Sequence, residues 1–334
     1  MSVSFAAPLG VVLGGTDAPT CADGVCSLQL SLGEGVAERQ LAFTLTQANS
    51  ASMSLPLNVT SADAAVQSAP TLLVWQVSVA AWSDMFDDPS TLSLWAELEP
   101  GRHDRLEISG GQLVLEPVAR QQEHWYADNR GAFVARRLHG DFLVEARVQA
   151  VQRHAPLLSP TAEYNGAGLL VRVPSAGVGN EQWLSFNTGM QQVSGGGPGF
   201  GRETKITTPG QPSSHSVRYL NAGPAIETLR LCRIGAELRV LYWNGSAWRE
   251  ELRSGATFVV STGPAPLATG SPLRFDASAW GDDVDVGLMA GNFFDSNDTT
   301  VPFAMPAGGE FQTRGLFDYV RFRDIVGVAD CAAP

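Results

Sequence analysis

The sequence contains little charge and almost no lysine. Only 17% of its 334 residues are charged, Lys205 is the single lysine, and the other basic residues are arginines. The net charge is −12. A nucleic-acid-binding surface needs a basic patch, so this composition argues against DNA or RNA as a partner. It leaves carboxylates available for a hard cation such as calcium.

Long apolar segments are also missing. No stretch of the sequence approaches the roughly 18 apolar residues that a membrane-crossing helix needs, so we expect no membrane span. The first 15 residues carry no positive charge, and Pro8 interrupts their apolar run. They do not have the pattern of a signal peptide, and we expect no export by the usual route.

Cysteine is scarce, and its spacing excludes a structural zinc site. Cys21 and Cys26 flank a turn-like stretch, so they are either a small disulfide loop or two free thiols. Cys232 lies in an apolar strand, where we expect a small buried side chain. We expect Cys331, near the C-terminus, to be free.

Helical periodicity is absent, and strand periodicity takes its place. Apolar residues recur at every second position in many short segments, as half-buried strands require. Asn244-Gly245 predicts a hairpin turn. A dozen or more antiparallel strands exceed what one twisted sheet accommodates, so the sequence predicts an all-β fold with two stacked sheets.

The strand pattern divides the chain into three parts. Residues 1–80 predict a small β-domain or docking arm of three or four strands. Residues 81–326 predict a two-sheet antiparallel jelly roll, and residues 327–334 predict a C-terminal tail. The segment from Val193 to Gly210, which is rich in glycine, is either a mobile surface loop or a binding loop.

The order of several motifs in the second part resembles a known family. These motifs are Phe86-Asp87-Asp88, Trp95, Ile108 to Leu115, Leu138 to Glu145, Ala167 to Arg172, Leu229-Arg230-Leu231, Val286 to Ala290 and Phe317 to Val320. Together they resemble the concanavalin A-like lectin/glucanase superfamily, over about residues 82–325. The most similar branch is the laminin-G-like modules that accompany β-xylosidases and related carbohydrate-active enzymes. Members bind glycans, bind proteins, hydrolyse glucans or build shells, so the resemblance implies a fold and not one activity.

No catalytic motif is present in the sequence. In the glucanase branch that this sequence resembles, one strand carries the motif Glu-x-Asp-x-x-Glu, and this chain has no such string. The acidic segment Asp282-Asp283-Val284-Asp285 is not followed by a glutamate at that spacing. No histidine lies in the context of a nucleophilic triad. We therefore expect a protein that is not an enzyme, although two distant carboxylates of a cryptic glycoside hydrolase could still meet in space.

The resemblance also suggests a cation site. In similar modules an acidic residue of the last strand lies beside the first strand, and often holds a structural calcium. The matching residues here are Asp87, Asp88 and Asp318. The alternative is that these acids cap turns or pair with arginine.

Glycan recognition requires aromatic rings that lie flat on sugars, with amide and charged groups beside them. Trp125, Tyr126, Asn129 and Arg130 form the most suggestive local group, and each aromatic is alternatively a core residue. The full set of candidates adds residues that could line one face of a sheet: Arg172, Trp183, Asn187 and Trp243.

These observations predict a non-catalytic binding or structural module displayed on an extracellular assembly such as a phage particle, as a capsid decoration or tail component. Its partners would be a glycan or cell-surface polysaccharide, bound by the jelly roll, and other subunits, bound through residues 1–80. Its location would be a virion or an extracellular surface. The alternative is a secreted carbohydrate-binding accessory module of a glycoside hydrolase system.

Overall fold

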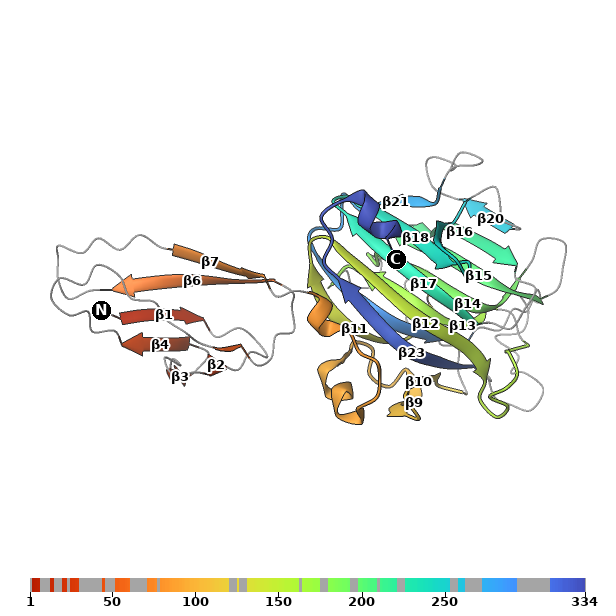
Figure 1. Ribbon diagram of the computed structural model, residues 1–334, viewed down its shortest axis with the longest axis horizontal. Coiled ribbons are helices and arrows are strands. Elements are labelled where there is room, and N and C mark those ends of the chain that lie inside the picture. Colours follow the sequence, from red (N-terminus) through yellow and green to blue (C-terminus); the bar gives the residue numbers. More distant parts are fainter. Residues whose placement is uncertain are drawn as a thin grey trace. The chain divides into compact units, whose positions relative to one another are not determined.

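The computed structural model divides the chain into two compact units, Met1–Ser78 and Val79–Pro334 (Figure 1). In the first unit the structure describes only the backbone of the strands. In the second it describes residues 79–119, 125, 131–161, 164–174, 180–192, 198–208, 211–220, 226–252, 258–261, 272–292 and 313–333. Of these, residues 191–192, 198, 208, 211–220 and 258–261 are described as backbone alone.

The first unit contains a five-stranded antiparallel sheet. Its order is β3 (Thr20–Ala22), β4 (Val25–Gln29), β1 (Ser2–Ala6), β6 (Ser52–Thr60) and β7 (Thr71–Gln76). A separate pair joins β2 (Leu13–Gly14) to β5 (Thr44–Leu45). Cys21 and Cys26 are opposite each other in the β3–β4 register. Their side chains lie outside the described part, so both alternatives, a disulfide and two free thiols, stay open.

The second unit is a sandwich of two antiparallel sheets, as predicted. We name them after their central strands. The β12 sheet has the order β19 (Trp248–Glu250), β18 (Glu237–Trp243), β17 (Ile226–Ile234), β12 (Phe142–Gln152), β23 (Thr313–Arg323), β10 (Gln112–Pro117) and β9 (His103–Ser109), with β21 (Arg274–Asp276) also paired to β18. The β13 sheet has the order β20 (Phe258–Ser261), β16 (Gln211–Leu220), β15 (Pro198–Thr208), β14 (Trp183–Gln192), β13 (Asn165–Arg172), β22 (Asp283–Gly291), β11 (Ala132–His139) and β8 (Ala96–Glu97).

Alternating residues of the two sheets form the core between them. The inward set on β12 includes Phe142, Val144 and Ala146, and the set on β13 includes Leu169 and Val171, all essentially without solvent exposure. Burying each of the larger side chains contributes about 1.5–3 kcal/mol, which makes this layer the main source of stability.

The sheets approach closely where β23 crosses β13. A Cβ atom on Gly315 would lie 2.9 Å from the Cβ of Ala167 and 3.3 Å from that of Ala290. A side chain at this position would push the two sheets apart, so glycine is required there by packing.

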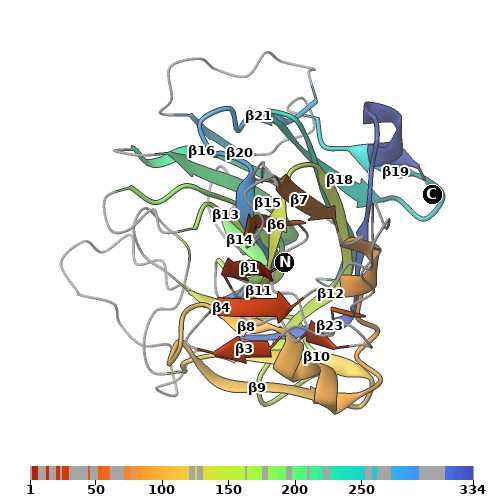
Figure 2. The same ribbon diagram turned by 90° about the vertical axis from the view of Figure 1, so that its left-hand side faces the viewer.

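Short 3-10 helices border the sandwich: η1 (Val79–Trp82), η2 (Pro89–Leu94) and η4 (Val328–Ala332). In Figure 2, η4 lies beside β19. Among the described residues, no helix has the length and apolar character of a membrane span.

The C-terminal segment corrects two predictions, one about Cys331 and one about the tail. Cys331, predicted to be free, forms a disulfide with Cys232, and their Cα atoms are 5.7 Å apart. Both side chains are buried with Leu143, Leu241 and Trp248 on the outer side of the β12 sheet. Residues 327–333, expected as a tail, are therefore fixed to the sandwich. The sequence showed no sign of this pair because 99 residues separate its members.

The predicted hairpin at Asn244 is present, but its turn is longer than the two residues of an Asn-Gly turn. Trp243 pairs with Trp248 across the hairpin. The Asn244 side chain accepts hydrogen bonds from the backbone N–H groups of Ser246 and Ala247. Gly245 supplies the positive φ angle of 95° that the turn needs.

Candidate functional site

A row of charged and aromatic residues crosses the outer face of the β13 sheet. The strand register places Arg137 opposite Asp285, Asp285 opposite Arg172, and Arg172 opposite Trp183. Residues paired in this way project from the same face of a sheet. Their neighbours along the strands, Val171 among them, fill the core, so this row faces away from it.

Arg172 joins two carboxylates at the centre of this row. Its Nη1 lies 2.5 Å from Glu99 Oε1, and its Nη2 lies 3.8 Å from Asp285 Oδ2. The other oxygen of Asp285 accepts a hydrogen bond of 2.5 Å from Arg137 Nε. The side chain of Asp285 is only 3% exposed. A buried carboxylate is tolerated when guanidinium groups compensate its lost hydration, which is the arrangement here.

Trp125 lies against this charged row. Its ring makes edge contacts with Phe133 and Trp183, with centroid distances of 5.7 and 5.9 Å, and the Arg172 guanidinium carbon is 5.8 Å from its centroid. Leu170 completes a buried hydrophobic cluster with these rings. Protein atoms therefore contact Trp125 and Trp183, two of the three tryptophans that the sequence suggested as sugar platforms, and neither ring is exposed.

Three buried polar atoms at this place have no hydrogen-bond partner within the described part of the chain. They are Trp125 Nε1, Arg172 Nε and Asp285 Oδ2. Buried polar groups are nearly always hydrogen-bonded, and an exception calls for a bound molecule or ordered water. Two donors and one acceptor of this cluster thus lack a hydrogen bond within the described residues, and Asp285 Oδ2 has only its 3.8 Å ion pair with Arg172.

Beyond the charged row, polar side chains of β14 and β15 continue along the same face. Ser185 is paired with Lys205, and Asn187 with Glu203. Ser185, Asn187 and Glu203 are all buried, although they lie on the outer face of the sheet. Gly189 follows on the same face of β14. A Cβ atom there would overlap the Asn165 carbonyl oxygen, so this position of the sheet carries no side chain.

The structure brings together only part of the predicted glycan set. Trp125, Arg172, Trp183 and Asn187 share the outer face of the β13 sheet. Trp243 is on the β12 sheet, half-buried against Trp248 at a centroid distance of 5.6 Å. The other three candidates fall outside the described residues: Tyr126, Asn129 and Arg130.

Sequence reasoning missed the charged partners of this cluster. Asp285 was noted within an acidic run, but not as a member of the site, and Glu99, Arg137 and Glu203 were not singled out. Asp283, Asp285, Gly287 and Met289 occupy every second position, which places them on one face of β22. This spacing could have marked Asp285 as a member of that face.

The predicted cation ligands have protein partners. The Asp88 carboxylate accepts a hydrogen bond from Ser90 N at 2.9 Å and caps η2, which lowers its pKa. Asp318 accepts hydrogen bonds of 2.6 Å from Gln112 and Arg147. Asp87 is exposed. Among the described residues, no group of three or more His, Cys, Asp or Glu is placed to hold a metal. Calcium binding stays a prediction.

A separate buried cluster lies at the end of the sandwich interior. Arg202 on β15 contacts the Glu251 carboxylate and, at 2.9 Å, that of Glu227; its guanidinium carbon is 3.8 Å from the centroid of the Tyr242 ring. Burial raises the pKa of Glu251 to about 7, against the opposing effect of Arg202. This cluster serves the packing of the interior and does not border the outer face.

Comparisons with known proteins identify a fold. No protein-family model matches the chain, and no curated protein matches it in sequence. A functionally unknown protein from Saccharomyces cerevisiae is 17% identical, with a TM-score of 0.43, over 71% of this chain and 99% of that one. The GH43 BlXynB protein of Bacillus licheniformis is 17% identical, with a TM-score of 0.46, over 73% of this chain and 39% of that one. A β-glucanase of the same species is 10% identical, with a TM-score of 0.37, over 73% and 97%.

These comparisons contradict the prediction that the chain is not an enzyme. The solved structures of similar fold include glycoside hydrolases, an alginate lyase and a porphyranase. The missing glucanase motif was taken as evidence against catalysis in general, and that conclusion was too broad, because the absence of one motif does not exclude other catalytic residues. The likeness itself is one of fold.

The chain spans 39% of the GH43 BlXynB protein and 39% of a xylan β-1,4-xylosidase of Bacillus halodurans. The glucanases, by contrast, are covered almost entirely. The sheet order and the two layers make the unit of residues 79–334 an antiparallel β-sandwich, as the jelly roll predicted from the sequence requires.

Proposed function

We propose that the second unit binds a carbohydrate on the outer face of the β13 sheet, at the cluster of Trp125, Arg172 and Asp285. The observation that supports this proposal is the set of three buried polar atoms without hydrogen-bond partners in the described structure. A sugar hydroxyl both donates and accepts hydrogen bonds, so one hydroxyl group or two neighbouring ones would satisfy both kinds of atom.

The surrounding residues suit the same ligand. Asn187 and Glu203 add an amide and a carboxylate along β14 and β15, and Lys205 adds a flexible donor. Binding sites for small polar ligands combine an apolar wall with a few well-placed polar groups. Here the wall is the cluster of Trp125, Phe133, Leu170 and Trp183.

The test is a glycan-array screen of the whole chain, followed by titration of any hit with Trp125→Phe. This substitution removes Nε1 and keeps an aromatic ring, so we expect a three- to tenfold loss of affinity, about what one hydrogen bond supplies. Trp243→Phe is the matched control on the other sheet and should leave affinity unchanged. Equal affinity of the Trp125→Phe variant and the wild type would remove this cluster from the site.

A second readout uses the single lysine. Bound ligand should protect Lys205 from amine-reactive labelling, measured by mass spectrometry of the peptide that contains it. The screen should also be run in calcium and in EDTA, since a calcium-dependent hit would support the predicted role of Asp87, Asp88 and Asp318. Binding that is unaffected by EDTA would exclude calcium from recognition.

Hydrolysis is the second candidate function. Glu99 and Asp285 both contact Arg172, so their carboxylates lie on either side of one guanidinium group. Glycosidases use two carboxylates about 5–10 Å apart, one as acid and one as base or nucleophile, and these two residues are the pair we propose for those roles. The polysaccharides bound in the screen should therefore be assayed for new reducing ends, with Asp285→Asn as the inactive control.

We also propose an extracellular or virion-surface location. The Cys232–Cys331 disulfide supports it, because disulfides persist in oxidising environments and are rare in the cytosol. We further propose that residues 1–80 attach the protein to a larger assembly such as a phage particle. The observation that supports this is the division of the chain into two compact units. Fractionation of the native host culture, followed by detection of the oxidised chain, tests the location.

A further inference from the structure

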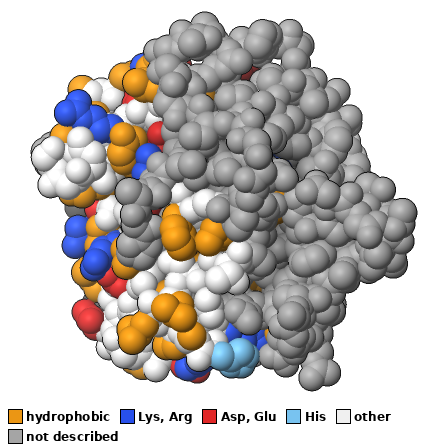
Figure 3. Space-filling view, turned by 90° about the vertical axis from the view of Figure 1, so that its right-hand side faces the viewer, with side chains coloured by type: hydrophobic (Ala, Val, Ile, Leu, Met, Phe, Trp, Pro, Cys, Tyr) orange, Lys and Arg blue, Asp and Glu red, His pale blue; other side chains and the backbone are white. Residues whose placement is uncertain are grey.

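Arginine gathers on the outer face of the β12 sheet. The alternating burial of β23 directs its buried residues toward the core and leaves Arg314, Arg321 and Arg323 on the outer side. Arg105 on β9 and Arg147 on β12 join them, because they contact partners on the same face. In Figure 3, basic side chains likewise gather along one border of the described surface. We name these five residues the arginine face.

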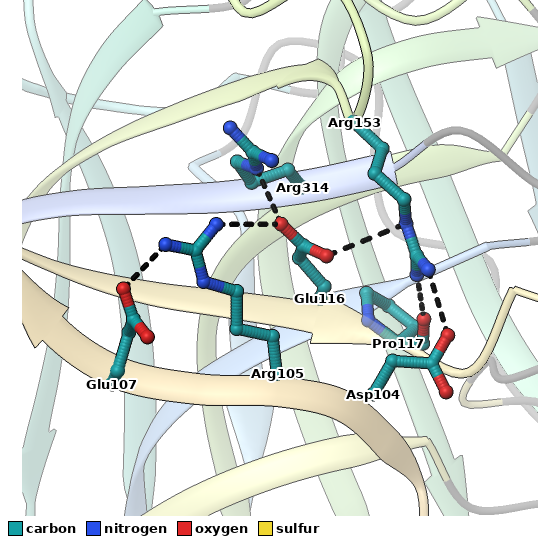
Figure 4. A network of polar contacts seen from close by, with 7 residues as sticks. All are labelled: Asp104, Arg105, Glu107, Glu116, Pro117, Arg153 and Arg314. Carbon is teal, nitrogen blue, oxygen red and sulfur yellow. Dashed lines mark hydrogen bonds and ion pairs between the residues drawn. The ribbon is translucent and has the colours of Figure 1, made fainter.

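Two carboxylates of this face, Glu116 and Glu145, are each shared between several arginines. Glu116 contacts Arg314 at 2.6 Å and both Arg105 and Arg153 at 3.5 Å, so three guanidinium groups surround one carboxylate (Figure 4). Glu145 lies between Arg230 at 2.5 Å and Arg321 at 3.5 Å. Both carboxylates are buried, so their negative charge is enclosed while the arginines face outward.

Sharing leaves many N–H groups unused. Each guanidinium has five donors. In the described structure Arg314 engages Glu116 through Nε, and Arg147 engages Asp318 through Nη1. The side chains of Arg147 and Arg321 are 53% and 43% exposed. The side chains of Arg147 and Arg321 are therefore accessible to an anion from solution.

Positive charge predominates here, in contrast to the chain as a whole. Six arginines lie on the outer sides of β9, β10, β12, β17 and β23: the five of the arginine face and Arg230 on β17. The same sides carry four carboxylates: Glu107, Glu116, Glu145 and Asp318. The whole chain has a net charge of −12. Arg314 and Arg321 are seven residues apart on one strand, which places them about 23 Å apart along it.

We propose that the arginine face binds an anionic polysaccharide, one that carries sulfate or carboxylate groups, along β23. A row of cations of this length fits an extended polymer better than a small ion. The interspersed Glu107 and Asp318 would repel the closely spaced phosphates of a nucleic acid, whose duplex carries one charge per about 1.7 Å. They are compatible with a polymer of lower charge density. This surface is on the opposite sheet from the carbohydrate site proposed above and does not depend on it.

The test measures binding of the whole chain to dextran sulfate over a series of NaCl concentrations, with uncharged dextran as the reference. We expect binding to dextran sulfate alone, weakening as salt rises. The variant Arg147→Gln/Arg321→Gln should lower the slope of log affinity against log salt by about two, one for each lost ion contact. Asp318 keeps Gln112 and Glu145 keeps Arg230, so the fold should survive, which a melting curve would establish.

Arg249→Gln/Arg274→Gln is the matched control. It removes the same charge from two exposed arginines at the far end of the β12 sheet, and should leave the slope unchanged. Equal slopes for the two double variants would overturn the proposal, as would equal binding to dextran and dextran sulfate. Tighter binding to duplex DNA than to dextran sulfate at equal charge concentration would overturn it in favour of a nucleic-acid surface. Trp125→Phe should not alter this binding, so failure of either site is recognised separately.

Discussion

At the scale of single residues, Glu251 is a carboxyl group whose pKa burial raises strongly. Its pKa rises from 4.5 to about 7, chiefly because burial disfavours the charged form. The folded protein therefore binds a proton at this site over a pH range in which the unfolded chain releases it. The contribution to stability is complete below pH 4.5 and disappears as the pH rises through 7.

Glu251→Gln tests this directly. The free energy of unfolding of the wild type should fall relative to that of the variant between pH 5 and pH 8, by about 1.4 kcal/mol for each unit of pKa shift. Urea unfolding of both proteins at several pH values measures the difference. Parallel curves across this range would show that Glu251 titrates normally.

Residue-scale patterns predicted some members of the candidate site but not the site as a unit. Trp125 and Arg172 stood out by residue type. Asp285 joins them only through the pairing of β22 with β13, which brings together residues more than a hundred positions apart in the chain. A single sequence contains no register information over that distance, because alternation fixes the face of each strand and not its neighbour.

At the scale of elements, the strands themselves were predictable. Alternating segments such as Asp141 to Val148 and Glu237 to Tyr242 became β12 and β18, with boundaries close to those expected. The alternation of apolar and polar residues within each segment is sufficient to predict a strand. The short helix η4 was not predicted, since its position depends on distant partners. Arg230, which is fully buried, donates hydrogen bonds to the carbonyl oxygens of Cys331 and Ala333.

The disulfide that holds η4 should contribute strongly to stability. It closes a loop of 99 residues, for which the chain-entropy model gives a contribution of about 4–5 kcal/mol. Cys232→Ala/Cys331→Ala should therefore unfold at a clearly lower guanidinium concentration than the wild type. A reducing agent should lower the midpoint of the wild type and leave that of the double variant unchanged. A midpoint in the double variant equal to the oxidised wild type would contradict this account.

At the scale of the whole molecule, the two units divide the chain at Ser78. The second unit has its own core and its own disulfide, so a chain of residues 79–334 should fold without the first. We expect its melting temperature to match the corresponding transition of the full chain, measured by calorimetry. A fragment that fails to fold, or melts at a much lower temperature, would show that residues 1–78 belong to the same cooperative unit.

The place of β23 has a consequence for how the chain is synthesised. This strand comes last along the chain, yet it lies between β12 and β10 in the middle of its sheet. While the ribosome is still translating, the halves of the β12 sheet have no central strand, and the unsatisfied edges of β10 and β12 stay open to wrong partners. The first unit can complete its sheet early, whereas the sandwich can close only after Arg323 has left the exit tunnel. A nascent chain that stalls before residue 313 therefore exposes the unpaired edges of β10 and β12.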